Sequence, residues 1–404
     1  MRWGMGVNIS YMGTKRELAP TVAEVVQSAQ DGPMLDAFSG MCSVGEAVGQ
    51  ARPVWINDIQ AFAYEVGTAM FTSAYPSLTS ADISDRLFYH YDTHFSRLRS
   101  VFVDALLEEE ALLQAPEFCD FVERYRCFKH SLNLSLTGSR KPEYSLFSTT
   151  YSDSFFGLGQ AMELDSIRFS AFKAYSEGFL NADQHRWALI ALGRAMLRVS
   201  NSTGHFAQFL KPKEGSFRVF LRQRRRSIWL EFLTAIEGLR PVGTASWRQD
   251  NRSFNRDSVS LIRSFGKRKI RPSVIYADPP YTDDQYSRYY HLLETLVKYD
   301  YPPVTGAGLY RPDRFRTPFS VKSLAPTAIM GIIGAAASIG ADLVLSYPTN
   351  GLACKAGFDI LTMMRERYPR AERCHAISHV HSTLGASKGS ATSPVIEQIF
   401  LGRV

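Results

Sequence analysis

The feature that most constrains the fold is a short apolar run at residues 274–277, which ends in Asp278, two prolines and Tyr281. An unbroken run of β-branched and aromatic residues is typical of a strand that is buried on both faces of a parallel sheet. Proline has no N–H to donate to a ladder, and the residue before each proline is restricted to extended conformations. The stretch therefore predicts a central strand that ends in a rigid polar corner.

Such a corner suits the transfer of a methyl group to an exocyclic amine. The reaction needs acceptors for the amino hydrogens, and the Asp278 carboxylate and the Pro279 carbonyl are acceptors of this kind. Holding the amine and the methyl donor near attack distance supplies about 7–11 kcal/mol of the barrier in the best model reactions. Tyr281 would stack on a base drawn out of its duplex. The alternative is an ordinary strand and proline turn in which Tyr281 is a packing residue.

The length, net charge and cysteine content of the chain limit the class of protein without identifying it. The chain has 404 residues, enough for two or three domains, and its net charge of +7 is compatible with a polyanionic partner. The five cysteines form no CxxC pair and the first residues lack the apolar core of a signal peptide, so we expect a cytoplasmic protein. No apolar segment reaches the roughly 20 residues that span a bilayer, so no membrane partner is expected.

The first part of the chain predicts a nucleoside site. An apolar strand from residue 34 enters a turn at Gly40 and continues into a helix at residues 46–50. A second strand at residues 54–58 ends in Asp58, about twenty residues after the turn begins. Glycine lets a ligand approach the backbone, and an acid at this distance in a βαβ unit can bind ribose hydroxyls. The glycine turn taken alone would be weak support.

Residues 61–244 follow a different pattern, with long stretches of helical period at residues 95–114, 116–131 and 182–199. This pattern predicts a helical insertion within an α/β domain. One tract of the insertion, residues 201–226, combines many basic side chains with interleaved phenylalanines. The tract predicts DNA contact through phosphates, although a solvated face is the alternative. The candidate DNA-binding residues are Lys211, Lys213, Arg222, Arg224, Arg225 and Arg226.

The α/β character returns at residues 245–250, where we expect a short strand that ends in Asp250. After the proline corner, a helix at residues 286–299, a mobile proline-rich loop over the site at 302–322 and a helix at 328–340 are expected. A strand at 342–347 and a helix at 358–367 precede two strands at 376–381 and 395–401, which would complete the sheet antiparallel. The Cys and His residues at 374–381 match no zinc spacing, so no metal site is predicted.

Together these motifs resemble the Dam-like class of N6-adenine DNA methyltransferases. Residues 11–15 are similar to the amino-terminal cofactor motif of that family, residues 36–40 to its glycine-rich motif, and residues 278–281 to its catalytic tetrad. The chain departs from the family at Cys42, where a second glycine is usual and where a side chain would narrow the approach of the cofactor.

The resemblance implies a Rossmann-like methyltransferase fold of the α/β class: a mostly parallel sheet flanked by helices, an antiparallel terminal strand and a large helical insertion. Residues 1–60 and 245–404 would form the catalytic domain, and residues 61–244 the target-recognition insertion. The expected donor is S-adenosylmethionine, with no metal. The implied cofactor-binding residues are Tyr11, Lys15, Asp36, Phe38, Ser39, Gly40, Asp58 and Asp250. The implied catalytic residues are Asp278, Pro279, Pro280 and Tyr281, which would hold a flipped adenine.

Three functions remain open from the sequence. The first is methylation of adenine N6 in double-stranded DNA, in a restriction-modification or phage-related setting, with a cognate restriction nuclease as partner although no nuclease motif is present. The second is methylation of an exocyclic amine in RNA, because similar proline corners serve RNA amines. The third is a catalytically silent nucleic-acid-binding protein. The recognition sequence and the oligomeric state cannot be derived from the sequence.

Overall fold

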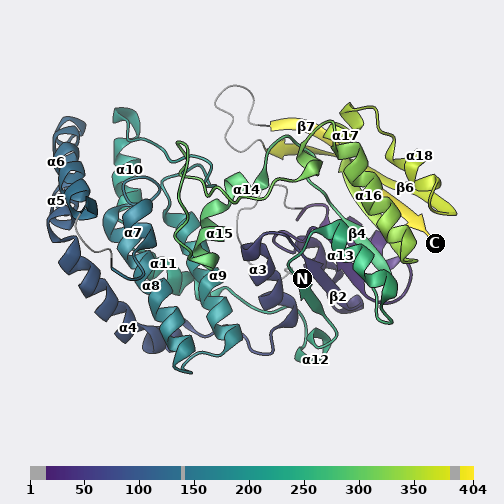
Figure 1. Ribbon diagram of the computed structural model, residues 1–404, viewed down its shortest axis with the longest axis horizontal. Helices are drawn as coiled ribbons and strands as arrows, with labels where there is room; N and C mark the ends of the chain where they lie inside the picture. Colours follow the sequence, from purple (N-terminus) through teal and green to yellow (C-terminus); the bar gives the residue numbers. More distant parts are fainter. Residues whose placement is uncertain (1–14, 138–141, 383–391) are drawn as a thin grey trace. The chain divides into compact units, whose positions relative to one another are not determined.

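The computed structural model describes residues 15–137, 142–382 and 392–404, and the chain divides into two compact units (Figure 1). The α/β unit comprises Met1–Ala74, Arg240–Arg288 and Arg314–Val404, and the helical unit comprises Tyr75–Leu239 and Tyr289–Asp313. The boundaries thus differ from those expected. Residues 61–74 belong to the α/β unit, and residues 289–313 return to the helical unit after the proline corner.

The described residues of the α/β unit form a seven-stranded sheet with the order β3-β2-β1-β4-β5-β7-β6. Neighbouring strands from β3 to β5 are parallel, whereas β7 runs antiparallel to both β5 and β6. The expected fold class is therefore confirmed, including the antiparallel terminal strand. The strands are β1 (Met34–Asp36), β2 (Val54–Asn57), β3 (Arg252–Phe254), β4 (Val274–Ala277), β5 (Asp342–Pro348), β6 (Arg370–Ser382) and β7 (Thr392–Arg403).

Helices cover both faces of this sheet, which explains why β1, β2, β4 and β5 are buried at every position. On one face, α13 (Ser258–Ser264) and α16 (Ala325–Ser338) share a core with Leu35, Ile275 and Leu343. On the other face, Gly67 of α3 (Ala61–Thr72) lies directly against Ile56. The remaining helices of the unit are α1 (Ala19–Gln27), α2 (Ser43–Val48), η1 (Gly49–Ala51), α12 (Ala245–Arg248), η3 (Phe265–Lys267), α14 (Tyr286–Tyr289), η4 (Pro318–Ser320), α17 (Leu352–Lys355) and α18 (Ile360–Arg365).

The expected strand at residues 245–250 is wrong, because this stretch begins with the helical turn α12. The Thr244 hydroxyl caps the turn by accepting from the Trp247 amide at 3.3 Å. The buried Arg248 guanidinium donates to the carbonyls of Ser73, Val242 and Gly243, which holds the turn in place. Strand β3 therefore starts only at Arg252, and a different acid follows its carboxyl end.

The helical unit is built from long amphipathic helices, as expected, with α9 at the predicted bounds. Phe102 divides the stretch predicted as one helix at residues 95–114 between α4 and α5. The helices are α4 (Ser80–Val101), α5 (Val103–Leu113), α6 (Phe118–Thr137), α7 (Leu146–Thr150), α8 (Leu158–Ser176), α9 (Ala182–Val199), η2 (Glu214–Ser216), α10 (Phe217–Arg224), α11 (Ile228–Glu237) and α15 (His291–Lys298). Within the described ranges, no helix has the length and apolar character needed to cross a membrane.

Candidate active site

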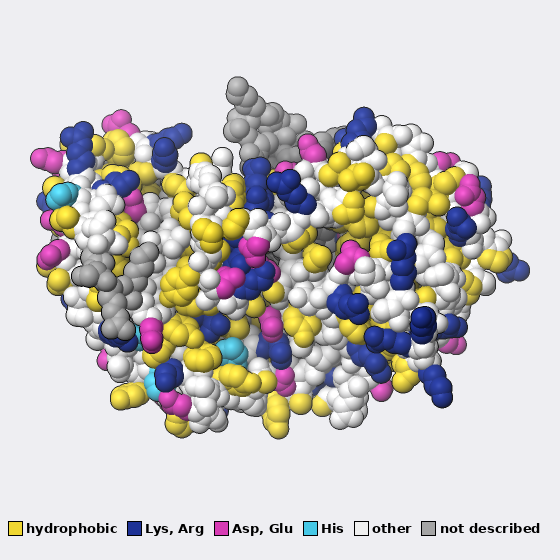
Figure 2. Space-filling model, in the orientation of Figure 1, with side chains coloured by type: hydrophobic (Ala, Val, Ile, Leu, Met, Phe, Trp, Pro, Cys, Tyr) yellow, Lys and Arg dark blue, Asp and Glu magenta, His cyan; other side chains and the backbone are white. Residues whose placement is uncertain are grey.

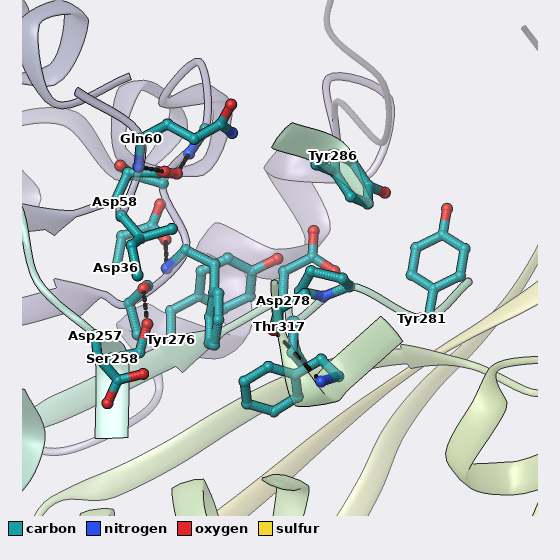
Figure 3. Close-up of a pocket in the computed structure, with 18 of the residues that line it drawn as sticks. Asp36, Asp58, Gln60, Asp257, Ser258, Tyr276, Asp278, Tyr281, Tyr286 and Thr317 are labelled. Atoms are coloured by element: carbon teal, nitrogen blue, oxygen red, sulfur yellow. Dashed lines mark hydrogen bonds between the residues drawn. The ribbon is translucent and has the colours of Figure 1, made fainter. Parts of the chain in front are cut away.

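A pocket of about 1070 Å³, counting its open mouth, lies at the carboxyl ends of β1, β2 and β4 (Figure 3). Parallel strands end at the same edge of a sheet, and ligands of α/β folds bind in the crevice at that edge. Asp58, Asp257 and Ser258 lie at one end of the view, Tyr281 and Tyr286 lie at the other, and Asp278 lies between them. The pocket thus extends to either side of the proline corner.

The turn between β1 and α2 is held by the acid that ends β2. Gly40 has a positive φ of 47°, and its amide donates to Asp58 Oδ2 at 2.9 Å. The Gln60 amide donates to Asp58 Oδ1 at 2.8 Å. Asp58 thus shapes the glycine turn and also lines the pocket, where its carboxylate oxygens are hydrogen-bond acceptors.

Cys42 does not narrow this turn, contrary to the expectation. It is fully buried, it is not among the residues that line the pocket, and its sulfur lies beside Gly67 of α3. Its φ of 64° is the left-handed conformation that favours glycine. The backbone therefore keeps the shape of a glycine turn although a side chain is present.

Asp36 ends β1 on the floor of the pocket, and its carboxyl group is buried. Burial raises the pKa of Asp36 to about 8, since removal from water disfavours the charged form, and the nearby carboxylates of Asp278 and Asp58 add to the rise. The Phe38 amide donates to Asp36 Oδ1 at 3.3 Å. The raised pKa favours the neutral form of Asp36 at neutral pH.

The proline corner carries a buried ion-pair cluster. Lys15 Nζ lies 3.2 Å from Asp278 Oδ1 and 2.7 Å from Oε1 of Glu397, which β7 contributes. Burial raises the pKa of Asp278, the Lys15 ammonium opposes that rise, and the Glu397 carboxylate adds to it. Burial lowers the pKa of Lys15, but Asp278 and Glu397 outweigh this effect and raise it above its ordinary value. Lys15 therefore remains protonated between two carboxyl groups.

Tyr281 closes the corner with a mostly buried ring. The ring meets Tyr347 edge-on at a centroid distance of 6.4 Å, and Lys15 Nζ lies 5.3 Å from the Tyr281 centroid. The Leu352 amide donates to the Tyr281 carbonyl at 3.0 Å, which fixes the backbone after the two prolines. The aromatic side chain is therefore positioned by the sheet and by α17.

The strap at residues 315–319 lines the opposite wall of the pocket. The sequence predicted a mobile loop here, without assigning residues to the site. Phe319 packs edge-on against Phe38 at 5.3 Å, and the Thr317 amide donates to Gln285 Oε1 at 3.2 Å. The Ser287 hydroxyl donates to the Phe315 carbonyl at 2.8 Å. The strap is therefore tied to the segment that follows the proline corner.

The structure brings most of the predicted site residues into one pocket. The lining includes Lys15, Asp36, Phe38, Ser39, Gly40, Asp58, Asp278, Pro279, Pro280 and Tyr281. Tyr11 lies outside the described residues. Asp250 is exposed and is not among the lining residues, whereas Asp257 and Ser258, which follow β3, are. Asp257 caps α13 by accepting from the Ser260 amide at 2.9 Å, and an acid before a helical pattern is a cap signal that would have identified it.

The predicted DNA-binding residues divide into two groups. Lys211, Lys213 and Arg222 are exposed. Arg224, in contrast, is buried and donates to the Ser154 carbonyl at 3.0 Å, so its predicted role at the surface is wrong. Arg225 is exposed but bonds to the Leu113 carbonyl, and Arg226 pairs with Glu231. On the face drawn in Figure 2, several basic side chains gather at the lower right.

The α/β unit has the topology of a Rossmann-like methyltransferase fold, and comparison with known proteins identifies the family. Residues 11–136 and 247–330 match the family of D12 class N6 adenine-specific DNA methyltransferases. The chain belongs to this family, and the expected resemblance to N6-adenine DNA methyltransferases is confirmed. The match does not extend over residues 137–246, most of which lie in the helical unit.

Three relatives are named as modification methylases or as a type II methyltransferase. Modification methylase LlaI of Lactococcus lactis subsp. lactis is 31% identical over 41% of this chain and 24% of that protein. Modification methylase StsI of Streptococcus sanguinis is 22% identical over 88% of this chain and 46% of that protein. Type II methyltransferase M.FokI of Planomicrobium okeanokoites is 26% identical over 75% and 39%, respectively. The chain thus spans about a quarter to a half of the length of these relatives.

Proposed function

We propose that this chain transfers a methyl group from S-adenosylmethionine to N6 of an adenine that is flipped out of double-stranded DNA. The observation that carries the proposal is a pocket at the carboxyl edge of the sheet. It joins the glycine turn with Asp58 to the proline corner with Asp278 and Tyr281. A nucleoside-binding end and an amine-binding corner are what methyl transfer between two such substrates requires.

The residues at the Asp58 end fit the nucleoside part of S-adenosylmethionine. Carboxylates accept hydrogen bonds from ribose hydroxyls, and Asp58 and Asp257 both lie on this wall of the pocket. Phe38 supplies an apolar ring for the purine, and the turn at Gly40 brings the backbone to the pocket surface. When bound, S-adenosylmethionine would supply an activated methyl group on its sulfonium.

The residues of the corner fit the adenine amine. The Asp278 side chain is 14% exposed, and its Oδ1 makes no well-aligned hydrogen bond within the described structure. Because Oδ1 is itself buried on the side of Lys15, the other carboxylate oxygen, Oδ2, would accept an amino hydrogen, together with the Pro279 carbonyl. Tyr281 would stack on the extruded base, since aromatic side chains hold flipped bases by stacking. The amine lone pair would then point towards the methyl donor.

The helical unit supplies the candidate DNA-binding residues. Exposed Lys211, Lys213 and Arg222 would contact phosphates, which strengthens binding by release of counterions. Because the relatives are named modification methylases, we assign the chain to a restriction-modification setting with a cognate restriction nuclease as partner. We also propose that it acts in the cytoplasm, where the chromosomal substrate of bacteria lies.

The deciding experiment incubates the purified chain with S-adenosylmethionine labelled in the methyl group and with either unmethylated bacterial DNA or total RNA. The nucleic acid is then digested, and the modified nucleoside is identified by mass spectrometry. N6-methyladenine in DNA is the expected product, and sequencing of the methylated DNA would give the recognised site. Label in RNA alone would replace the proposal with RNA methylation. Label in neither, despite cofactor binding, would favour a silent binding protein.

A further inference from the structure

Glu397 is a buried acid to which neither the sequence motifs nor the family match assigns a role. It lies on β7, opposite Pro348 of β5, and its side chain is 1% exposed. A buried carboxylate is costly unless it is paired. Its Oε1 accepts from Lys15 Nζ at 2.7 Å, and the same ammonium lies 3.2 Å from Asp278 Oδ1. Two acids therefore share one cation beside the proline corner.

The two contacts of the ammonium are unequal, and the difference bears on the chemistry. The contact with Glu397 has the length and alignment of a charge-assisted hydrogen bond, whereas Asp278 Oδ1 has no well-aligned hydrogen bond. Oδ1 is buried on the side of Lys15, so Oδ2 is the oxygen left for the target amine. Without Glu397, the ammonium would be able to move over the Asp278 carboxylate and donate to Oδ2 as well. Glu397 draws the ammonium away from that position, while the positive charge stays close enough to stabilise the Asp278 carboxylate.

We infer that Glu397 is a positioning residue for methyl transfer: by holding Lys15, it keeps the Asp278 carboxylate available to accept a hydrogen bond from the target amine. The inference rests on the proposed function, since it assigns to Asp278 the role of amine acceptor. Glu397 is not among the residues that line the pocket, so it would act through Lys15. The β7 strand, which runs antiparallel at the end of the fold, thereby contributes to the catalytic corner.

The test compares Glu397→Gln with the wild-type chain in single-turnover methylation at saturating cofactor and DNA, from pH 5.5 to 8.5. The variant removes the charge that holds Lys15, so the ammonium would bond to Asp278 and the plateau rate is expected to fall roughly 10- to 100-fold. The acid limb of the profile should shift to lower pH, because Glu397 no longer raises the pKa of Asp278. If Glu397 had only a structural role, the acid limb would stay at the same pH in the variant.

Other groups also face Asp278 and belong in the interpretation of the profile. They are Lys15 from the segment before α1, Asp36 from β1, and Tyr276 and Tyr281 from the corner strand and its extension. All of them remain in the variant. Glu372→Gln is the matched control, since it removes an exposed carboxylate from the neighbouring strand β6 and should leave both rate and acid limb unchanged.

Glu397→Asp provides a second variant that keeps the charge at a shorter reach. It is expected to slow the reaction only several-fold and to retain the wild-type acid limb. A Glu397→Gln chain with the wild-type rate and limb would overturn the inference, as would a slow Glu397→Gln or Glu397→Asp chain whose only other change is a lower unfolding temperature. Absence of methylation by the wild-type chain would instead refute the proposed function.

Discussion

The α/β unit and the helical unit use buried charge differently. In the α/β unit, the ion pairs of Lys15 with Asp278 and Glu397 lie at a pocket that Lys15 and Asp278 line, where the proposed function places a ligand. In the helical unit, Arg224 is buried against the Ser154 carbonyl and near Glu109, which caps α8 by accepting from the Leu158 and Gly159 amides. These charges join helices to each other. Charged residue types alone therefore do not distinguish a site from a structural support.

The strongest test of this difference between the two units is a substitution at Asp278. We expect Asp278→Ala to lower the single-turnover methylation rate on the order of 1000-fold, as removal of one preorganised polar group from a catalytic site does. Folding and cofactor binding should change little, because Lys15 keeps its bond to Glu397. Calorimetric titration of S-adenosylmethionine is the control. If cofactor affinity fell as much as the rate, Asp278 would belong to the cofactor end of the pocket.

Arg224→Met, in the helical unit, should instead lower the free energy of unfolding. The substitution leaves the Ser154 carbonyl and the Glu109 carboxylate without a buried cation, which costs about 3 kcal/mol of unfolding free energy. Urea unfolding measures this loss, and Arg222→Met, at an exposed position two residues earlier, should stay within about 0.5 kcal/mol. Equal stability of the two variants would show that Arg224 does not stabilise the fold.

The exposed basic residues of the helical unit are expected to affect DNA binding without affecting folding. Replacing Lys211, Lys213 and Arg222 by glutamine should weaken DNA binding and reduce the slope of log affinity against log salt by up to about 2.7, at about 0.9 for each phosphate contact. A matched triple variant of the α/β unit removes the same charge from exposed positions: Lys355, Arg365 and Arg367. Identical slopes for the two triple variants would show that only net charge matters.

The smallest expected effect separates two acids that flank β3. Asp257→Asn keeps the cap of α13, since asparagine caps as well as aspartate does, but it removes a carboxylate from the nucleoside end of the pocket. S-adenosylmethionine should bind about fivefold more weakly, which corresponds to the loss of one hydrogen bond of about 1 kcal/mol. Asp250→Asn should bind it as the wild type does, and the reverse result would restore the role expected of Asp250.

The helical unit shows where prediction from the sequence was limited. Helical periodicity located α9 and the general course of the insertion, because an apolar stripe is a local pattern. The same local reading assigned Arg224 to the surface with its neighbours. Its burial depends on α10 packing against the segment around Ser154, and no spacing within residues 217–224 records that contact.

The sequence by itself determined the strands of the sheet core, the glycine turn and the proline corner, because apolar runs, Gly40 and the paired prolines restrict the backbone locally. Only the tertiary structure decided which acids share the pocket. Asp257 lines the pocket and Asp250 does not, because α12 occupies the residues where a strand was expected and β3 begins after it. Glu397 bonds to Lys15, which is 382 positions away in the sequence. The physical reason is that hydrogen bonds and ion pairs depend on distance in space, which for these residues is set by the order of strands in the sheet.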